Sequence, residues 1–177
     1  MSPKITPALP EHLGSIAALE AQLFERGLRH DALQSLAKGT AFRGFVIVKD
    51  DADTPDNHPI AYILAHVTDD GGNTGSDTGS DTGGNTGGNT EGEILSLGTD
   101  PAYYRRGFAS ALCRHLIDQL GPKAGLFLEV AEDNHAAKQL YEGLGFRPIA
   151  VRRDYYKRAN GVIDAIVMRR DNAELDL

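Results

Sequence analysis

The sequence predicts an α/β protein with a mixed sheet in a single domain that spans residues 1–177, and three observations support this fold class. With 177 residues, 41% of them hydrophobic and 24% charged, the chain has the size and composition of one ordinary globular domain. Two strand-like segments in the first half are separated by turn residues, as in an antiparallel hairpin. Strand and helix patterns then alternate, which favours a mixed sheet.

The individual elements follow from the spacing of the apolar residues. A helix is predicted over 10–25, where Leu13, Ile16 and Leu23 recur on one face, and a shorter helix is predicted around 30–38. Two more helices are predicted over about 107–120 and 134–144. Strands are predicted over 42–49, 59–67, 93–99 and 126–130, with two closing strands near 147–156 and 162–169.

Residues 71–90 consist of five tandem tetrapeptides, GGNT-GSDT-GSDT-GGNT-GGNT. No apolar side chain lies between 69 and 93, so this stretch cannot bury enough surface to offset its loss of backbone entropy. We therefore expect a disordered insertion over about 69–92, in the loop between two strands. Calcium-binding glycine–aspartate repeats have a nine-residue period with a regular apolar position. The period here is four with no apolar position, which favours a flexible hairpin tip.

Charge and cysteine content limit the classes of partner. The formal net charge is −7, but six acids and no Lys or Arg lie between 69 and 93, so the rest of the chain is close to neutral. It has no basic stripe, and we expect no direct nucleic-acid ligand. The single cysteine, the absence of a secretory or transit pattern and the lack of any ~20-residue apolar run predict a cytoplasmic protein without membrane contact. The six histidines lack metal-ligand spacing, so we expect no metal.

Residues 105–110, RRGFAS, have the features of a phosphate-binding helix start. Gly107 and Ala109 leave the backbone uncovered where a helix presents unpaired N–H groups and a partial positive charge. Arg105 and Arg106 add positive charge. The segment is neither a Walker A loop nor a full dinucleotide-binding fingerprint, and a solvated helix start with two surface arginines explains these residues equally well.

Two further side chains could carry chemistry. Glu129 interrupts the apolar strand GLFLEV and shares a face with Phe127, at the edge of the core. A carboxylate there is more often paired with a neighbouring Lys or Arg than catalytic. Tyr141 lies in a helical apolar stripe, where core packing is the commoner role of an aromatic residue. Neither residue indicates a function by itself.

The order of these motifs resembles a known family. The glycine loop, the strand ending in LEV, the segment NHAAKQLYEGLGF and then RRDYY and DAIVM resemble the GNAT superfamily of acyl-CoA N-acyltransferases. Within it the chain looks most like the bacterial ribosomal-protein alanine N-acetyltransferases and related enzymes of protein N-termini, strongly over 93–169 and loosely over 4–67. The resemblance implies a GNAT-type, mostly antiparallel sheet of about seven strands flanked by four helices.

The resemblance also implies roles for particular residues. Glu129 would be the general base and Tyr141 the general acid. Substrate-binding positions would be Phe24, Tyr155 and Tyr156, although the segment LFERGLRHD lacks the proline and tryptophan that relatives often place beside the substrate. Acetyl-CoA would be held by the residues that match the family's cofactor-binding positions: Leu97, Gly98, Thr99, Arg105, Arg106, Gly107, Phe108, Ala109, Ser110 and Asn134.

These roles predict direct transfer of an acetyl group from acetyl-CoA to the α-amine of a protein N-terminus, with a ribosomal protein as the candidate substrate. Glu129 would take the amine proton, Tyr141 would protonate the departing thiolate, and strand N–H groups would stabilise the oxyanion. No acyl-enzyme is needed, so Cys113 is expected to be a buried core residue. Two alternatives remain open: a GNAT acting on a small-molecule amine or a lysine side chain, and a non-catalytic acyl-CoA-binding module.

Overall fold

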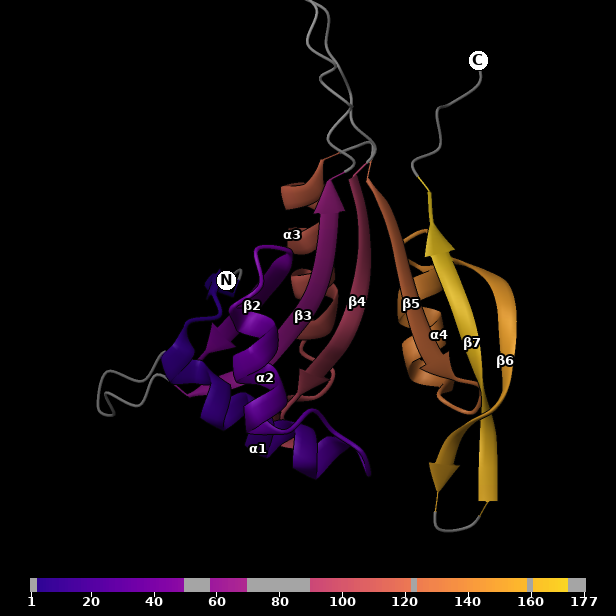
Figure 1. Cartoon of the computed structure of the whole chain (residues 1–177), viewed down its shortest axis with the longest axis horizontal. Helices are drawn as coiled ribbons and strands as arrows, with labels where there is room; N and C mark the ends of the chain where they lie inside the picture. The colour runs from indigo at the N-terminus through magenta and orange to yellow at the C-terminus, as the bar shows by residue number, and fades with distance from the viewer. Residues whose placement is uncertain (1–2, 50–57, 70–89, 122–123, 159–160, 172–177) are drawn as a thin grey trace, which may run out of the picture.

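The computed structural model describes residues 3–49, 58–69, 90–121, 124–158 and 161–171 (Figure 1). Its centre is a seven-stranded sheet in which β4 and β5 are parallel and every other neighbouring pair is antiparallel. The strand order is β1-β2-β3-β4-β5-β7-β6. The elements are β1 (Ile5–Pro7), α1 (Leu13–Leu23), α2 (His30–Ala37), β2 (Phe42–Val48), β3 (Pro59–Asp69), β4 (Thr90–Thr99), α3 (Phe108–Leu120), β5 (Gly125–Ala131), α4 (His135–Glu142), β6 (Arg147–Arg158) and β7 (Gly161–Arg170).

The predicted fold class is confirmed, and each predicted helix and strand is present with its ends shifted by a few residues. The sequence does not predict β1, because three residues are too few to show an alternating pattern. This short strand forms the edge of the sheet by pairing Ile5 with Ile47 of β2.

The hairpin of β3 and β4 extends into the segment where the insertion was expected. β3 runs to Asp69 and β4 starts at Thr90, and these two residues are paired. Polar and glycine residues can continue a strand when the neighbouring strand satisfies their backbone groups. Glycine also suits position 92, because a Cβ there would lie 2.8 Å from Cδ2 of Leu126. The predicted disorder of 70–89 falls outside the described residues.

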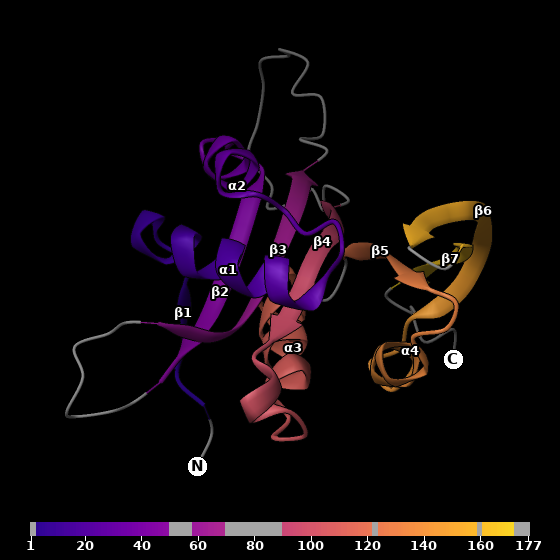
Figure 2. The ribbon, with the colours of Figure 1, turned by 90° about the horizontal axis from the view of Figure 1, so that it is seen from below.

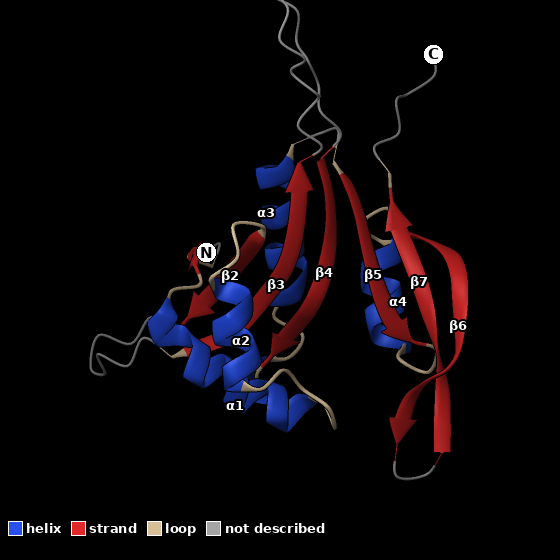
Figure 3. Ribbon diagram, viewed as in Figure 1, coloured by secondary structure: helices blue, strands red, loops and turns tan. Residues whose placement is uncertain are grey.

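The helices cover both faces of the sheet (Figures 2 and 3). α1 and α2 pack on one face through a core that includes Ile16 and Leu33. α3 and α4 pack on the other face, where the core includes Leu116 and Phe146. Cys113 is fully buried in this second core, as expected, and burial raises the pKa of its thiol to about 12. The apolar stripe of each helix therefore faces the sheet, as its sequence periodicity predicts.

β4 and β5 are paired over only part of their length. Their parallel ladder ends at the pair of Ile94 with Leu128, after which β4 continues along β3 and β5 continues along β7. The register of β4 on β3 shifts at the same place, because Leu95 is an extra residue between Ile94 and Ser96. Such a β-bulge bends a strand and increases its twist. Figure 1 shows the result, two strands that are adjacent at one end and separated at the other.

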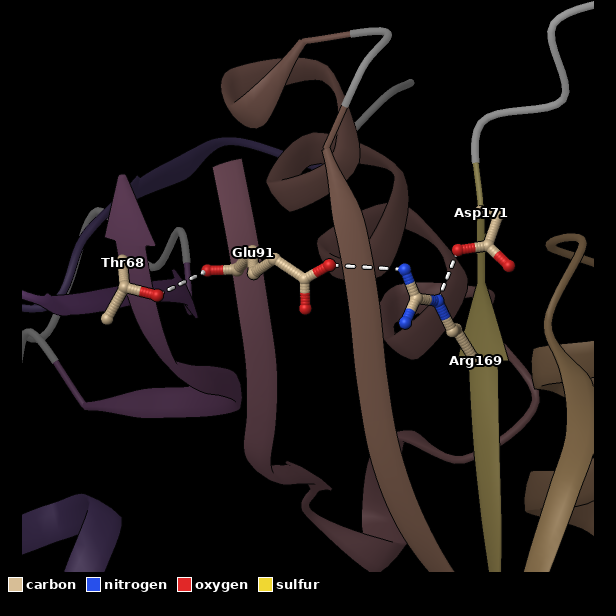
Figure 4. Close-up of polar contacts among 4 residues, drawn as sticks. All are labelled: Thr68, Glu91, Arg169 and Asp171. Carbon is tan, nitrogen blue, oxygen red and sulfur yellow. Dashed lines mark hydrogen bonds and ion pairs between the residues drawn. The ribbon is translucent and has the colours of Figure 1, made fainter. Parts of the chain in front are cut away.

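A group of polar contacts holds the paired end of β4 and β5 together (Figure 4). The guanidinium of Arg169 on β7 donates to Glu91 Oε1 at 3.1 Å and also pairs with Asp171. The same guanidinium lies 4.4 Å from the ring centroid of Phe127 on β5. Thr68 of β3 donates to the backbone oxygen of Glu91 at 3.4 Å. These contacts link four neighbouring strands opposite the end where β4 and β5 separate.

Replacing residues 70–89 by the two-residue turn Asn-Gly should leave the melting temperature unchanged or raise it by a few degrees. Asp69 and Thr90 are already paired, and a two-residue turn joins antiparallel strands well. Reducing the number of residues between two paired strands in this way lowers the entropic cost of closing the connection by roughly 2 kcal/mol. Differential scanning calorimetry of the two proteins measures the change. A fall of more than about 5 °C would contradict this expectation, because it corresponds to lost packing.

Candidate active site

Among the described residues, the separation of β4 from β5 leaves one edge of β4 without a strand partner. Leu97, Gly98 and Thr99 pair with β3 on one side, but the ladder with β5 has ended at Ile94 on the other. Backbone N–H and C=O groups require partners, so such an edge can bind an extended ligand much as it would bind another strand. The three β4 residues predicted to contact acetyl-CoA therefore lie on this edge, where Leu97 and Thr99 are half-buried and Gly98 is buried.

Residues 105–110 form a sharp turn up to Gly107 and then the first residues of α3. Arg105 has φ of 62° and Gly107, the N-cap residue of α3, has φ of 79°. Glycine has no side chain to offer the first N–H groups of the helix, so these groups can donate to an anion. Nothing lies within 4 Å of the place where a Cβ of Gly107 would be, and both arginines are exposed. This open, positively charged helix start fits a phosphate-bearing ligand.

Two aromatic rings, those of Tyr103 and Phe108, pack beside the turn that precedes α3. The guanidinium of Arg106 lies 5.0 Å from the ring centroid of Tyr103, and that ring stacks on Phe108 with centroids 6.4 Å apart. A short 3-10 turn, Pro101–Tyr103, precedes them, and its start is capped by Asp100, which accepts from the Ala102 N–H at 2.8 Å. These contacts fix the path of the chain from the end of β4 to the start of α3.

Glu129 lies on β5 immediately after the last residue that pairs with β4. Its side chain is 19% exposed and forms an ion pair with Arg152 of β6. The expectation that this carboxylate has a basic neighbour is therefore confirmed. The Arg152 guanidinium in turn lies 4.3 Å from the ring centroid of Tyr155. Hydrogen bonding with the Glu129 carboxylate raises the pKa of the Tyr155 phenol.

Tyr156, the next residue of β6 after Tyr155, lies against the backbone of β5. Its hydroxyl donates to the backbone oxygen of Glu129 at 3.5 Å, and its ring meets that of Tyr155 edge-on with centroids 5.1 Å apart. Burial raises the pKa of Tyr156 to about 12. Glu129, Tyr155 and Tyr156 are thus brought together by the fold, as the resemblance implies.

An irregularity in β6 produces this arrangement. The register of β6 on β7 shifts between Arg152 and Tyr156. Asp154, inside the shifted segment, has φ of 54°, and its N–H donates to Asp164 Oδ1 at 2.8 Å. A bulge redirects the side chains of a strand. In a regular strand, the side chains on one face are two residues apart. Because of the bulge, Arg152, Tyr155 and Tyr156 of the RRDYY segment all lie toward Glu129 in spite of their different spacing.

Tyr141 on α4 is 7% exposed and packs edge-on against Phe146, with ring centroids 5.6 Å apart. Core packing is therefore part of its role. Burial raises the pKa of its phenol, so Tyr141 keeps its proton at neutral pH. Within the described part of the chain its hydroxyl forms no hydrogen bond. A buried hydroxyl of this kind can donate to a bound ligand.

The two remaining predicted residues lie at helix ends. Asn134 is the N-cap of α4, and its side-chain oxygen accepts from the Ala137 N–H at 3.1 Å, so helix capping accounts for it structurally. Phe24 is the C-cap of α1 and is 40% exposed. α1 lies beside β3 and β4 and apart from β6 (Figure 2), so Phe24 belongs to the opposite side of the β4–β5 separation from Tyr155.

Sequence reasoning missed Arg152 and Glu20. Arg152 is one of five basic residues in 147–158, and nothing in the sequence distinguishes it as the partner of Glu129. Glu20 is 2% exposed on α1. The sequence offered one indication of this burial: Glu20 follows the apolar Ile16 by four residues, which places an acid on the apolar face of the helix.

Other kinds of site receive no support from the described residues. Among them, no group of three or more His, Cys, Asp or Glu side chains is arranged to hold a metal ion. None of the helices in the described ranges is long and apolar enough to cross a membrane. A pocket of about 310 Å³ lies beyond the end of α4 and contains none of the predicted residues; its lining is Glu142, Gly145, Phe146, Arg147 and Pro148.

The family can be assigned from a profile of related sequences. The model of the acetyltransferase (GNAT) family matches residues 15–146. The chain belongs to this family. The matched range runs from α1 past the end of α4 and so contains the free edge of β4, the turn before α3 and Glu129. The predicted resemblance to GNAT enzymes is confirmed.

Individual GNAT relatives match over a shorter range. The chain is 46% identical over 77 residues to ribosomal protein bS18-alanine N-acetyltransferase of Escherichia coli K12, covering 42% of this chain and 52% of that protein. It is 43% identical over 82 residues to N-alpha-acetyltransferase RimI of Mycobacterium tuberculosis, covering 46% of this chain and 50% of that protein. The chain thus spans about half the length of the curated relatives it matches.

Solved GNAT structures match nearly the whole chain. The crystal structure of ribosomal-protein-S18-alanine N-acetyltransferase from Escherichia coli superposes with a TM-score of 0.75 and 27% identity, covering 98% of this chain and 97% of that one. Arabidopsis thaliana NAA60 in complex with acetyl-CoA superposes with a TM-score of 0.76 and 21% identity, covering 95% of this chain and 97% of that one. The second likeness concerns the fold alone.

Gly107→Ala should destabilise the protein by about 1 kcal/mol, because an L-residue at φ of 79° adopts the disfavoured left-handed conformation. Gly14→Ala is the matched control, since Gly14 lies in α1 and also has nothing within 4 Å of a Cβ. The control should stabilise the protein by about 0.5–1 kcal/mol, because alanine is a better helix former. Urea denaturation measures both changes, and equal changes would contradict the left-handed conformation at Gly107.

Proposed function

We propose that this chain is an acetyl-CoA-dependent N-acetyltransferase that acts on the α-amine of a protein N-terminus, with a ribosomal protein as the candidate substrate. Residues 1–177 would form one acetyltransferase domain. The observation that carries this proposal is the place of Glu129, directly after the last β4–β5 pair and beside Tyr155 and Tyr156 of β6. The names of the relatives, bS18-alanine N-acetyltransferase and N-alpha-acetyltransferase, support the choice of acceptor.

The residues predicted to bind acetyl-CoA fit such a ligand. The free edge of β4 at Leu97, Gly98 and Thr99 suits an extended arm that carries amide groups. The N–H groups that follow Gly107 suit a pyrophosphate, with Arg105 and Arg106 adding charge. When bound, acetyl-CoA supplies an activated thioester.

The acceptor must be a neutral amine when it attacks. At pH 7.4 an α-amine is roughly a fifth neutral, whereas a lysine amine is neutral in about one molecule in a thousand. Glu129 would accept the proton that the nitrogen loses as the new C–N bond forms, directly or through a water. The ion pair with Arg152 holds the carboxylate of Glu129 in one orientation, which favours this transfer.

The leaving thiolate also needs a proton as the C–S bond breaks. Tyr141 is protonated at neutral pH because burial raises its pKa, and its hydroxyl has no other acceptor among the described residues. Its phenol would therefore donate to the sulfur. One proton leaves the amine and one reaches the thiolate, so the transfer requires no covalent enzyme intermediate.

Short peptides with free and with blocked N-termini distinguish the proposed acceptor from the alternatives. A CoA-release assay should detect turnover of free N-termini and little turnover of peptides that have a blocked N-terminus and an internal lysine. Equal turnover of the two groups would exclude the preference for α-amines. Binding of acetyl-CoA without turnover of any amine would indicate a binding module instead.

Glu129→Gln should lower kcat by about a hundredfold, because general-base catalysis contributes at least that much and an amide accepts a proton poorly. The dissociation constant of acetyl-CoA, measured by calorimetry, should change less than about twofold, because the backbone carries most of that binding. Glu132→Gln is the control, since Glu132 is exposed in the turn that follows the same strand. An unchanged kcat for Glu129→Gln would remove Glu129 from this role.

A further inference from the structure

Glu20 is a buried carboxylate on α1, four residues before Phe24. It is 2% exposed, within the core that joins α1 and α2 to the sheet. A buried charge is costly unless hydrogen bonds or an opposite charge compensate it. Among the described residues no Lys or Arg pairs with Glu20. Its compensation comes from hydrogen-bond donors instead.

Three donors from three different segments converge on this carboxylate. The Tyr62 hydroxyl of β3 donates to Oε1 at 2.7 Å, and the Ser96 hydroxyl of β4 donates to the same oxygen. The backbone N–H of Leu28, in the connection between α1 and α2, donates to Oε2 at 2.9 Å. Each donor is satisfied by a charged acceptor, which makes these bonds stronger than neutral ones.

The first two donors place the carboxylate against the bulge of β4. Ser96 directly follows the extra residue Leu95, at the point where β4 has left β5. The Tyr62 ring lies over Gly98, so closely that a Cβ there would be 2.5 Å from the ring. Glu20 therefore contacts the strand whose free edge is proposed to bind acetyl-CoA. That edge is also held by the β3 ladder, so it does not depend on Glu20 alone.

The third donor belongs to the connection between α1 and α2. Within the described residues, the bond from the Leu28 N–H to Glu20 is the sole hydrogen bond that ties 25–28 to the rest of the chain. Gly27 packs against the same residue, since a Cβ there would lie 2.5 Å from the Glu20 backbone oxygen. Figures 1 and 2 both show this connection passing the end of β4 near its separation from β5.

We propose that Glu20 is a positioning residue that sets the α1–α2 connection, with the exposed Phe24 at its start, against the bulge of β4. This fixes Phe24, one of the residues proposed to bind the acceptor, relative to the free edge of β4 that is proposed to bind acetyl-CoA. The inference rests on the proposed function. Loss of Glu20 should loosen the connection, which then keeps the packing of Leu28 but no hydrogen bond to α1, and should leave the β4 edge in place on its β3 ladder.

Glu20→Met, which keeps the side-chain length and removes both acceptors, tests the proposal. The KM for a peptide acceptor should rise about tenfold, the value of one lost charge-assisted hydrogen bond, while the KM for acetyl-CoA changes less than about threefold. Glu20→Gln is the conservative control. Its amide oxygen can still accept from Leu28, and its NH2 can donate to the two hydroxyls, so both KM values should stay near wild type.

A purely structural role gives a different result. Destabilisation alone lowers the amount of active enzyme and hence the apparent kcat, but it leaves both KM values unchanged. If Glu20→Met does not fold, Gly27→Ala displaces the same connection from its other side without altering the carboxylate. It should raise the peptide KM in the same selective way. An unchanged peptide KM, or equal rises in both KM values, in the variant that folds would overturn the proposal.

Hydrogen exchange at the Leu28 amide gives a readout that does not require turnover. The amide should be protected in the wild type and in Glu20→Gln, and should exchange at least about tenfold faster in Glu20→Met or Gly27→Ala. Protection that persists in both of these variants would contradict the tether. Because this measurement is independent of catalysis, failure of the proposed function would appear only in the peptide assay.

Discussion

The separation of β4 from β5 after Ile94 and Leu128 is the constraint on which the rest of the site depends. A strand that leaves its neighbour exposes backbone groups that need other partners, and this need creates a place for an extended ligand. The bulge at Leu95 bends β4 at that point, and the contacts of Arg169 hold the other end closed. The opening therefore has a fixed position in the sheet.

The two sides of this opening use different chemistry. On the side of β4 and α3, the groups proposed to bind acetyl-CoA are mostly backbone, placed by the positive φ angles of Arg105 and Gly107. Recognition through the backbone depends little on the side chains that the turn carries. On the side of β5 and β6, the groups proposed to act are side chains, and Glu129 is paired with Arg152.

The buried carboxylate of Glu20 connects β3 and β4 to the helices α1 and α2. Its three donors come from β3, β4 and the α1–α2 connection, so one side chain fixes the relative place of elements that are distant in sequence. Replacing such a group with an apolar one often costs little stability when all partners change together. The structural consequence of Glu20 is therefore the position that it gives to the connection.

The sequence by itself determined the elements, the family and the residues of the glycine turn, because periodicity and short motifs are local properties of a chain. It also indicated a basic partner for Glu129 and core burial for Cys113 and Tyr141. The tertiary structure alone decided that Arg152 is that partner, since register shifts in β6 choose among several equivalent arginines. It likewise decided where β4 leaves β5 and which donors meet at Glu20. These contacts join segments far apart in sequence, and no local pattern records which of them the packing will bring together.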